Sequence, residues 1–99
     1  MKISVLGCGR WGSFIAWYQA TVLKNKVISW GPEGEYSYEV LKNTGKNEYV
    51  TLDKSIDLTC DLKRAVTESD VIIISISSQG LRGFMKKVTQ YPVSDITFV

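Results

Sequence analysis

The sequence predicts an α/β fold, in which a mainly parallel sheet of five strands lies between helices on both faces. Short apolar runs of strand length alternate along the chain with segments of helical periodicity. One run, residues 70–76, is rich in β-branched side chains, which indicates a strand buried on both faces of the sheet. A glycine-rich turn, residues 7–12, joins the first apolar run to the first helical segment, as in β-α-β units.

Composition limits the classes of protein to consider. The 99 residues are enough for one domain, and 44% hydrophobic residues suit a globular core. The net charge of +2, from 12 basic and 10 acidic residues, comes without a basic stripe, so we expect no nucleic-acid partner. No apolar run approaches the roughly 20 residues of a membrane helix. Glycines and Arg10 interrupt the N-terminal apolar run where a signal peptide would continue. We therefore predict a cytoplasmic protein without a membrane span.

The residues suited to metal binding or acid–base catalysis are few. Cys8 and Cys60 are the only cysteines, and their spacing matches no metal or redox motif, so we expect reduced structural thiols. The chain contains no histidine, which removes the commonest general base and most zinc sites. We predict no metal site and assign no catalytic residue.

The glycine turn follows the first expected strand, residues 3–6. Gly7 permits a tight exit from the strand, Gly9 leaves room for a diphosphate at the backbone, and Gly12 lets the helix pack closely. The first backbone N–H groups of that helix form an anion site without a basic side chain. The alternative is a strand-to-helix turn that merely contains three glycines, but its place between a strand and a helix favours the anion site.

Residues 13–23 form the first expected helix. It is apolar around most of its circumference, which predicts burial on more than one side. Gly12, Ala16 and Ala20 recur every four residues and form a small-residue stripe that can approach the sheet. Asn25 is the expected left-handed cap at the end of this helix.

The second expected strand, residues 27–30, ends where such folds hold the adenosine ribose. Pro32 and Glu33 border this position, and an acidic side chain about 20 residues beyond the glycine turn accepts hydrogen bonds from ribose hydroxyls. No Lys or Arg lies between Val27 and Leu41, which favours NAD over NADP. The alternative is that Glu33 is only a solvated turn residue.

The middle of the chain contains shorter elements. We expect a short helix at residues 35–41, a loop at 42–54 that serves a ligand or a partner, and an edge strand at 56–59. Asp61 is placed to cap a brief helix whose apolar face consists of Leu62, Ala65 and Val66.

The strand at residues 70–76 belongs in the centre of the sheet, and Ser77 and Ser78 follow at its carboxyl end, where ligands bind in open α/β sheets. Ser78 is the expected cap of a helix with apolar positions at Leu81, Phe84, Met85 and Val88. A turn at residues 91–94 and a strand at 95–99 complete a Rossmann-type fold of three layers with predicted strand order 3-2-1-4-5.

Several stretches resemble one family closely. They are Gly7-Cys8-Gly9-Arg10-Trp11-Gly12-Ser13, Val27-Ile28-Ser29-Trp30-Gly31, Asn47-Glu48-Tyr49-Val50, Thr59-Cys60-Asp61-Leu62, and residues 75–82 with Ser78-Gln79 and Leu81-Arg82. Together they resemble the N-terminal NAD-binding domain of NAD(P)-dependent sn-glycerol-3-phosphate dehydrogenase, over essentially all 99 residues. The chain departs from that family at two positions, with Pro32 in place of an arginine and Ser77 in place of a proline.

The resemblance implies a set of cofactor contacts. Arg10 and Trp11 would contact the cofactor beside Gly7, Gly9 and Gly12, Pro32 and Glu33 would border the adenosine ribose, and Ser77 and Ser78 would approach the nicotinamide, with Tyr49 as a further contact. The family's catalytic lysines lie beyond the fifth strand and in a helical C-terminal domain. We therefore expect residues 1–99 to be a truncated dinucleotide-binding domain, inactive alone, that meets glycerol 3-phosphate or dihydroxyacetone phosphate only together with that domain.

Two other functions stay open at this stage. The chain could be a free-standing dinucleotide-sensing module, or the NAD-binding domain of a 3-hydroxyacyl, 6-phosphogluconate or ketopantoate dehydrogenase. Trp11 and Ser78-Gln79 favour the glycerol-3-phosphate enzyme by resemblance. We also expect self-association, because the fifth strand, around Phe98 and Val99, has an uncovered edge.

Overall fold

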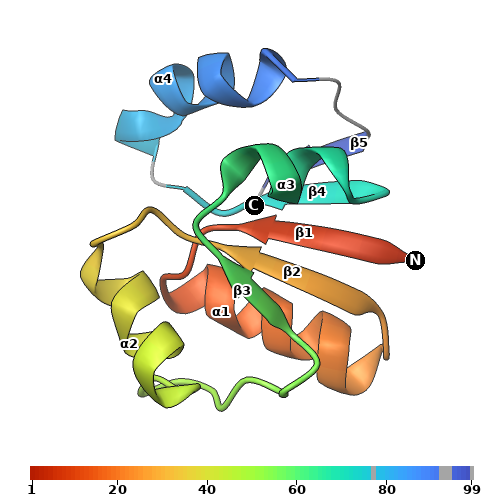
Figure 1. Cartoon of the computed structure of the whole chain (residues 1–99), viewed down its shortest axis with the longest axis vertical. Coiled ribbons are helices and arrows are strands. Elements are labelled where there is room, and N and C mark those ends of the chain that lie inside the picture. The colour runs from red at the N-terminus through yellow and green to blue at the C-terminus, as the bar shows by residue number, and fades with distance from the viewer. Residues whose placement is uncertain (77, 92–94, 99) are drawn as a thin grey trace.

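The computed structural model describes residues 1–76, 78–91 and 95–98. Its elements are β1 (Lys2–Leu6), α1 (Arg10–Trp17), the π-helical turn η1 (Tyr18–Val22), β2 (Lys26–Trp30), α2 (Tyr36–Thr44), β3 (Asp57–Thr59), α3 (Leu62–Thr67), β4 (Val71–Ile74), α4 (Ser78–Thr89) and β5 (Asp95–Phe98). The strands form one parallel sheet (Figure 1). The predicted Rossmann-like α/β fold is confirmed, including the order β3-β2-β1-β4, and β5 continues the sheet beyond β4.

Alternate residues of β1 serve two separate hydrophobic layers. Ile3 and Val5 pack with α1 and η1, whereas Leu6 packs with α3 and α4 on the opposite face. The hydroxyl of Ser4, which is fully buried, donates to the carbonyl of Ala65 in α3. Figure 1 shows α1 and α2 on one side of the sheet and α3 and α4 on the other. Helices therefore cover both faces, as the sequence predicts.

The β-branched run forms an inner strand of the sheet, β4, which pairs with β1 on one side and β5 on the other. Ile72 and Ile74 join the cluster beneath α3 and α4, while Ile73 joins the cluster beneath α1. This confirms the predicted burial on both faces. The strand ends at Ile74, two residues earlier than expected, and brings residues 75–76 beside the glycine turn.

The prediction that the first helix is buried on more than one side is wrong. One face of α1 and η1 meets the sheet, where Gly12, Ala16 and Ala20 are buried as the stripe predicts. The opposite face is exposed and carries Trp11, Phe14, Tyr18, Val22 and Leu23. A helix in the outer layer of an α/β fold needs only one apolar face, and among the described residues no further layer covers the second one.

The ends of two helices also differ from expectation. Lys24, with φ of 59°, takes the left-handed conformation instead of Asn25, whose side chain donates to Gln19 Oε1 at 2.9 Å. Helix α2 runs to Thr44, beyond the expected end at residue 41, because Gly45 adopts φ of 75° and its N–H closes onto the Leu41 carbonyl at 2.8 Å.

Of the two predicted N-terminal helix caps, one is confirmed and the other is wrong. Asp61 caps α3, since its Oδ1 accepts the Arg64 N–H at 3.2 Å. Ser78 is the first residue of α4 and not its cap. Of the predicted turn at residues 91–94, only Tyr91 lies within the described residues. None of the helices in the described part of the chain is long and apolar enough to span a membrane.

Candidate functional site

The three glycines of the turn differ in what surrounds them. At Gly7, with φ of 130°, an added Cβ would lie 2.3 Å from the carbonyl oxygen of Ser75. At Gly12 it would lie 2.2 Å from the carbonyl oxygen of Gly7. The protein's own packing therefore requires glycine at both positions. Gly9 has φ of −74°, and apart from its chain neighbours no described residue has an atom within 4 Å of its Cβ position. Gly9 thus faces open space that a side chain could have filled.

That open space adjoins the start of α1. Gly9 is the N-cap residue, and within the described part of the chain no side chain caps the helix there. The first N–H groups of a helix have no intrahelical acceptor and carry a partial positive charge. The helix start therefore suits an anion that approaches the backbone at Gly9.

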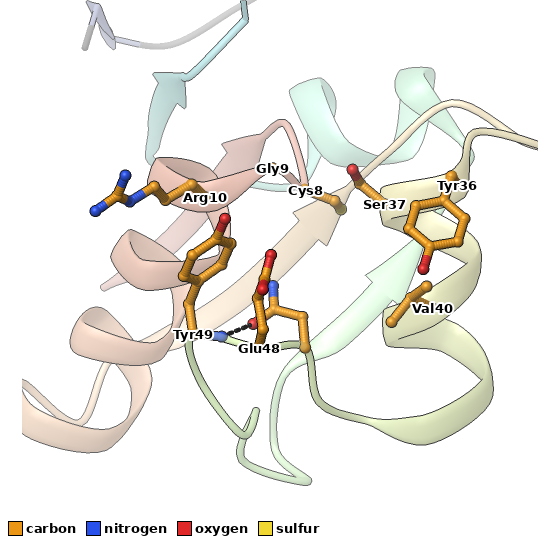
Figure 2. Close-up of a pocket in the computed structure, with 9 residues that line it drawn as sticks. Cys8, Gly9, Arg10, Tyr36, Ser37, Val40, Glu48 and Tyr49 are labelled. Carbon is orange, nitrogen blue, oxygen red and sulfur yellow. Dashed lines mark hydrogen bonds between the residues drawn. The ribbon is translucent and has the colours of Figure 1, made fainter.

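A hollow of about 380 Å³, the glycine-turn hollow, lies between this helix start and α2 (Figure 2). It is lined by the turn residues Cys8, Gly9 and Arg10, by Tyr36, Ser37 and Val40 of α2, and by Asn47, Glu48 and Tyr49 of the following loop. In Figure 2 Arg10 extends away from Tyr36 and Ser37, on the same side of the hollow as Tyr49.

A second, more aromatic hollow of about 510 Å³ lies outside the turn and is lined by Arg10, Trp11, Phe14, Glu48 and Tyr49. The guanidinium carbon of Arg10 lies 5.4 Å from the Tyr49 ring centre and 5.9 Å from that of Trp11. Glu48 raises the pKa of the Tyr49 hydroxyl, an effect that Arg10 opposes. The structure therefore brings together three residues that the resemblance implied, Arg10, Trp11 and Tyr49.

A third hollow of about 380 Å³, the β2–α4 hollow, lies at the carboxyl end of β2 and is lined by Trp30, Pro32, Glu35, Ile76, Gly83, Phe84 and Lys87. The rings of Trp30 and Phe84 are 5.2 Å apart. The Trp30 Nε1–H is buried and has no acceptor among the described residues. Gly83 lies inside α4, yet apart from its chain neighbours and the nearby backbone of its own helix no described atom lies within 4 Å of its Cβ position.

The remaining predicted site residues are less closely placed. Pro32 lines the β2–α4 hollow, but Glu33 is exposed in the turn after β2, and Glu35 lines the hollow instead. Ser78 begins α4, and Ser77 lies outside the described residues. The ribose contact of Glu33 and the nicotinamide contacts of both serines stay predictions.

Cys8 has a structural role beneath the turn. Its thiol lies 3.4 Å from the Trp30 carbonyl and 3.6 Å from the Ser29 hydroxyl. Burial raises the pKa of this thiol to about 11, so it stays protonated at neutral pH. Cys8 and Cys60 are both free cysteines; Cys8 is buried, as expected of a structural thiol, whereas Cys60 is exposed.

Sequence reasoning missed several residues that line the hollows. The sequence patterns place Trp30 in a strand and Phe84 on the apolar face of a helix, because periodicity does not show which core residue also borders a ligand space. Tyr36 and Ser37 could have been found, since they begin the helix that directly follows β2. The position of Asn47 depends on its contact with Ser13, which lies 34 residues earlier in the sequence and which no local pattern shows.

The described residues combine a parallel sheet with a helix start that no side chain caps and with Gly9, at which packing does not require glycine. Together these features define a dinucleotide-binding domain of the Rossmann type. A family model described as the N-terminus of NAD-dependent glycerol-3-phosphate dehydrogenase matches residues 2–99. The chain belongs to this family. This membership decides against the other dehydrogenase families considered from the sequence.

Similar proteins agree with this assignment. A protein of Thermoanaerobacter sp. (strain X514) named glycerol-3-phosphate dehydrogenase (NAD(P)+) is 33% identical over 101 residues, which cover 100% of this chain and 30% of the relative. A crystal structure of glycerol-3-phosphate dehydrogenase from Coxiella burnetii has a TM-score of 0.85 at 21% identity, over 98% of this chain and 31% of that one. The enzyme from Saccharomyces cerevisiae has a TM-score of 0.79 at 24% identity, over 99% of this chain and 32% of that one. These two structures show the shared fold, and the chain spans about a third of each relative.

Proposed function

We propose that the chain binds NAD(H), with the diphosphate at the start of α1. One observation carries this proposal: neither the packing nor the backbone conformation requires glycine at residue 9, and Gly9 faces the open space beside the helix start. A bound diphosphate gives a reason for glycine there, because it must approach the backbone N–H groups closely. Gly7, Arg10, Trp11, Gly12 and Tyr49 then lie around the diphosphate, the middle part of the cofactor.

The β2–α4 hollow is the proposed place of the adenine. Its walls include the rings of Trp30 and Phe84, which suit a flat base, and the buried Trp30 N–H lacks a protein acceptor among the described residues. Pro32 lines this hollow, and Glu33 follows it in the turn, near where the adenosine ribose would lie. The nicotinamide would extend toward Ser77 and Ser78.

We propose a preference for NAD over NADP. Glu33 and Glu35 follow β2, and their carboxylates oppose a 2′-phosphate, while Pro32 replaces the arginine that the family resemblance leads one to expect. Lys87 is a cation that the sequence argument did not count, because it reaches the same hollow from α4. Calorimetric titration with NADH and NADPH tests the preference, and tighter binding of NADPH contradicts it.

The proposed role of the whole enzyme is interconversion of sn-glycerol 3-phosphate and dihydroxyacetone phosphate. The nicotinamide supplies the hydride chemistry when bound, and residues 1–99 hold and orient the cofactor. We assign none of these residues as catalytic. We therefore expect the 99-residue protein to bind NADH without reducing dihydroxyacetone phosphate, and measurable turnover would contradict this division of roles. A cytoplasmic location is part of the same proposal.

We also propose that the 99-residue chain self-associates. β5 is an edge strand of the sheet, and the exposed aromatic side chains of α1 and η1 add apolar surface that water contacts in the monomer. Sedimentation velocity over a range of protein concentrations tests this, and a monomer throughout contradicts it. The same measurement with NADH tests the sensing alternative, since that function requires assembly to depend on the ligand.

A further inference from the structure

The loop after α2 lies beside the start of α1 and is held there by one side chain. Asn47 Nδ2 donates to the hydroxyl of Ser13 at 3.0 Å, across 34 residues of sequence. Asn47 Oδ1 accepts the backbone N–H groups of Tyr49 and Val50, each at 2.9 Å, and the first of these bonds is drawn in Figure 2. The amide thus fixes the loop's own turn and joins it to the helix.

Ser13 carries the connection to the glycine turn. Its side chain is fully buried and its hydroxyl donates to the Gly9 carbonyl at 2.7 Å. A hydroxyl has one proton and two lone pairs, so a hydroxyl that donates to Gly9 can accept from Asn47. The orientation of the Asn47 amide is fixed in turn, because its oxygen accepts two backbone N–H groups. A continuous path of hydrogen bonds therefore runs from the loop to Gly9.

The loop supplies one wall of the glycine-turn hollow. Glu48 and Tyr49 line that hollow, and the Tyr49 ring lies against Arg10. Among the described residues, the other hydrogen bonds of this loop lie within it or join it to the end of α2, as when the Thr44 hydroxyl donates to the Lys46 carbonyl at 2.8 Å. The Asn47–Ser13 bond is therefore the hydrogen bond that joins this wall to the start of α1, and it helps to set the distance between the wall and the backbone at Gly9.

We propose that Asn47 is a positioning residue of the dinucleotide site, which holds the Glu48–Tyr49 wall in register with Gly9 before the diphosphate binds. This inference rests on the proposed binding of NAD(H) at the start of α1. A preformed wall removes the ordering of the loop from the free energy of binding. Loss of the link should therefore weaken cofactor binding even when the protein stays folded.

A double-mutant cycle isolates the link. Asn47→Asp keeps the acceptor for Tyr49 and Val50 and removes the donor to Ser13, while Ser13→Ala removes the acceptor. Losing one hydrogen bond's net contribution corresponds to about a 5-fold rise in the Kd for NADH. We expect Asn47→Asp to cause this rise in the wild-type background and little further rise in the Ser13→Ala background. The added negative charge acts in both backgrounds, so an equal effect in both contradicts the proposal.

Asn25→Asp is the matched control, because it also replaces an amide that donates to a side chain, Gln19, at 2.9 Å. It adds the same charge at the far end of the helix and should leave the Kd unchanged. Asn47→Asp should weaken the binding of ADP, which carries the diphosphate, and leave that of adenosine unchanged. Amide hydrogen exchange should be faster at residues 46–51. A merely structural role would lower the unfolding midpoint without this difference between ligands.

The outcomes separate this inference from the proposed function. If the wild-type chain binds no NADH, the proposed function fails and the role of Asn47 fails with it. If the wild type binds NADH and Asn47→Asp binds it equally well, the role of Asn47 alone fails. If Asn47→Asp weakens NADH and adenosine alike, the loop does not act at the diphosphate, which also contradicts the inference.

Discussion

Replacing Gly9 by alanine tests whether glycine at this position serves ligand binding or the packing of the fold. The Gly9 backbone is extended with φ of −74°, which alanine adopts, and apart from its chain neighbours no described residue has an atom within 4 Å of the new methyl group. Reducing the freedom of the unfolded chain stabilises the fold by about 0.4–1 kcal/mol. Alanine is a poorer helix N-cap than glycine, by a similar amount. These contributions offset, so the free energy of unfolding should stay within about 1 kcal/mol of wild type.

Binding should respond quite differently to the same methyl group. A diphosphate that hydrogen-bonds the N–H groups at the start of α1 needs donor–acceptor distances of about 2.7–2.9 Å. A methyl group at residue 9 stands in that approach. Losing one hydrogen bond to a charged group costs about 1.5–3 kcal/mol, which corresponds to roughly a 10- to 150-fold rise in the Kd for NADH. Calorimetric titration and urea unfolding of the same preparation measure both quantities.

Gly12→Ala is the comparison variant. Its Cβ would lie 2.2 Å from the Gly7 carbonyl oxygen, so the helix must shift and the fold should lose about 1–3 kcal/mol or more. The reasoning on Gly9 is refuted if Gly9→Ala binds NADH as tightly as wild type. It is also refuted if Gly9→Ala destabilises the protein as much as Gly12→Ala, since Gly9 would then serve the fold.

Three further predictions concern other parts of the chain. Gly83→Ala should stabilise α4 by about 0.5–1 kcal/mol in urea unfolding and weaken adenosine binding in the β2–α4 hollow; unchanged adenosine binding places the base elsewhere. Asp61→Ala should lower the free energy of unfolding by about 1 kcal/mol through loss of the α3 cap, without changing the Kd for NADH. The pKa of Cys8 rises from 9.0 to about 11 on folding. The unfolded thiol therefore ionises first, and stability should fall from pH 9 upward, by about 2 kcal/mol at pH 11 relative to Cys8→Ala.

The strand order could be predicted because each step depended on local patterns. Continuous β-branched residues placed β4 inside the sheet, and the length of the segment from β1 to β2 required a parallel crossover. Burial alternation in β1 then follows, with Val5 facing α1 and Leu6 facing α3 and α4. Local sequence patterns thus predict most of the architecture, although the strand pairs themselves join segments distant in sequence.

The parts that could not be predicted depend on contacts distant in sequence. An apolar helix face looks the same in the sequence whether the sheet covers it or solvent does, which is why the exposed Phe14 and Tyr18 were expected to be buried. Asn47 reaches Ser13 across 34 residues. The turn after β2 also brings Glu35 to the β2–α4 hollow, which the spacing did not indicate, because side-chain direction in an irregular turn does not follow from counting residues.

Gly9 and Gly83 share a property that bears on the proposed cofactor. At both positions the Cβ site is empty, and each residue lines a hollow, Gly9 beside the start of α1 and Gly83 beside the end of β2. Glycine inside a helix such as α4 lowers the stability of the fold relative to alanine. A glycine that packing does not require therefore indicates that the space beside it is kept free for a ligand. The two hollows lie next to the carboxyl ends of neighbouring strands, the edge at which parallel sheets bind ligands. A ligand that uses both is elongated, with an anionic part at the helix start and a flat ring against Trp30 and Phe84, and a nicotinamide dinucleotide meets both requirements.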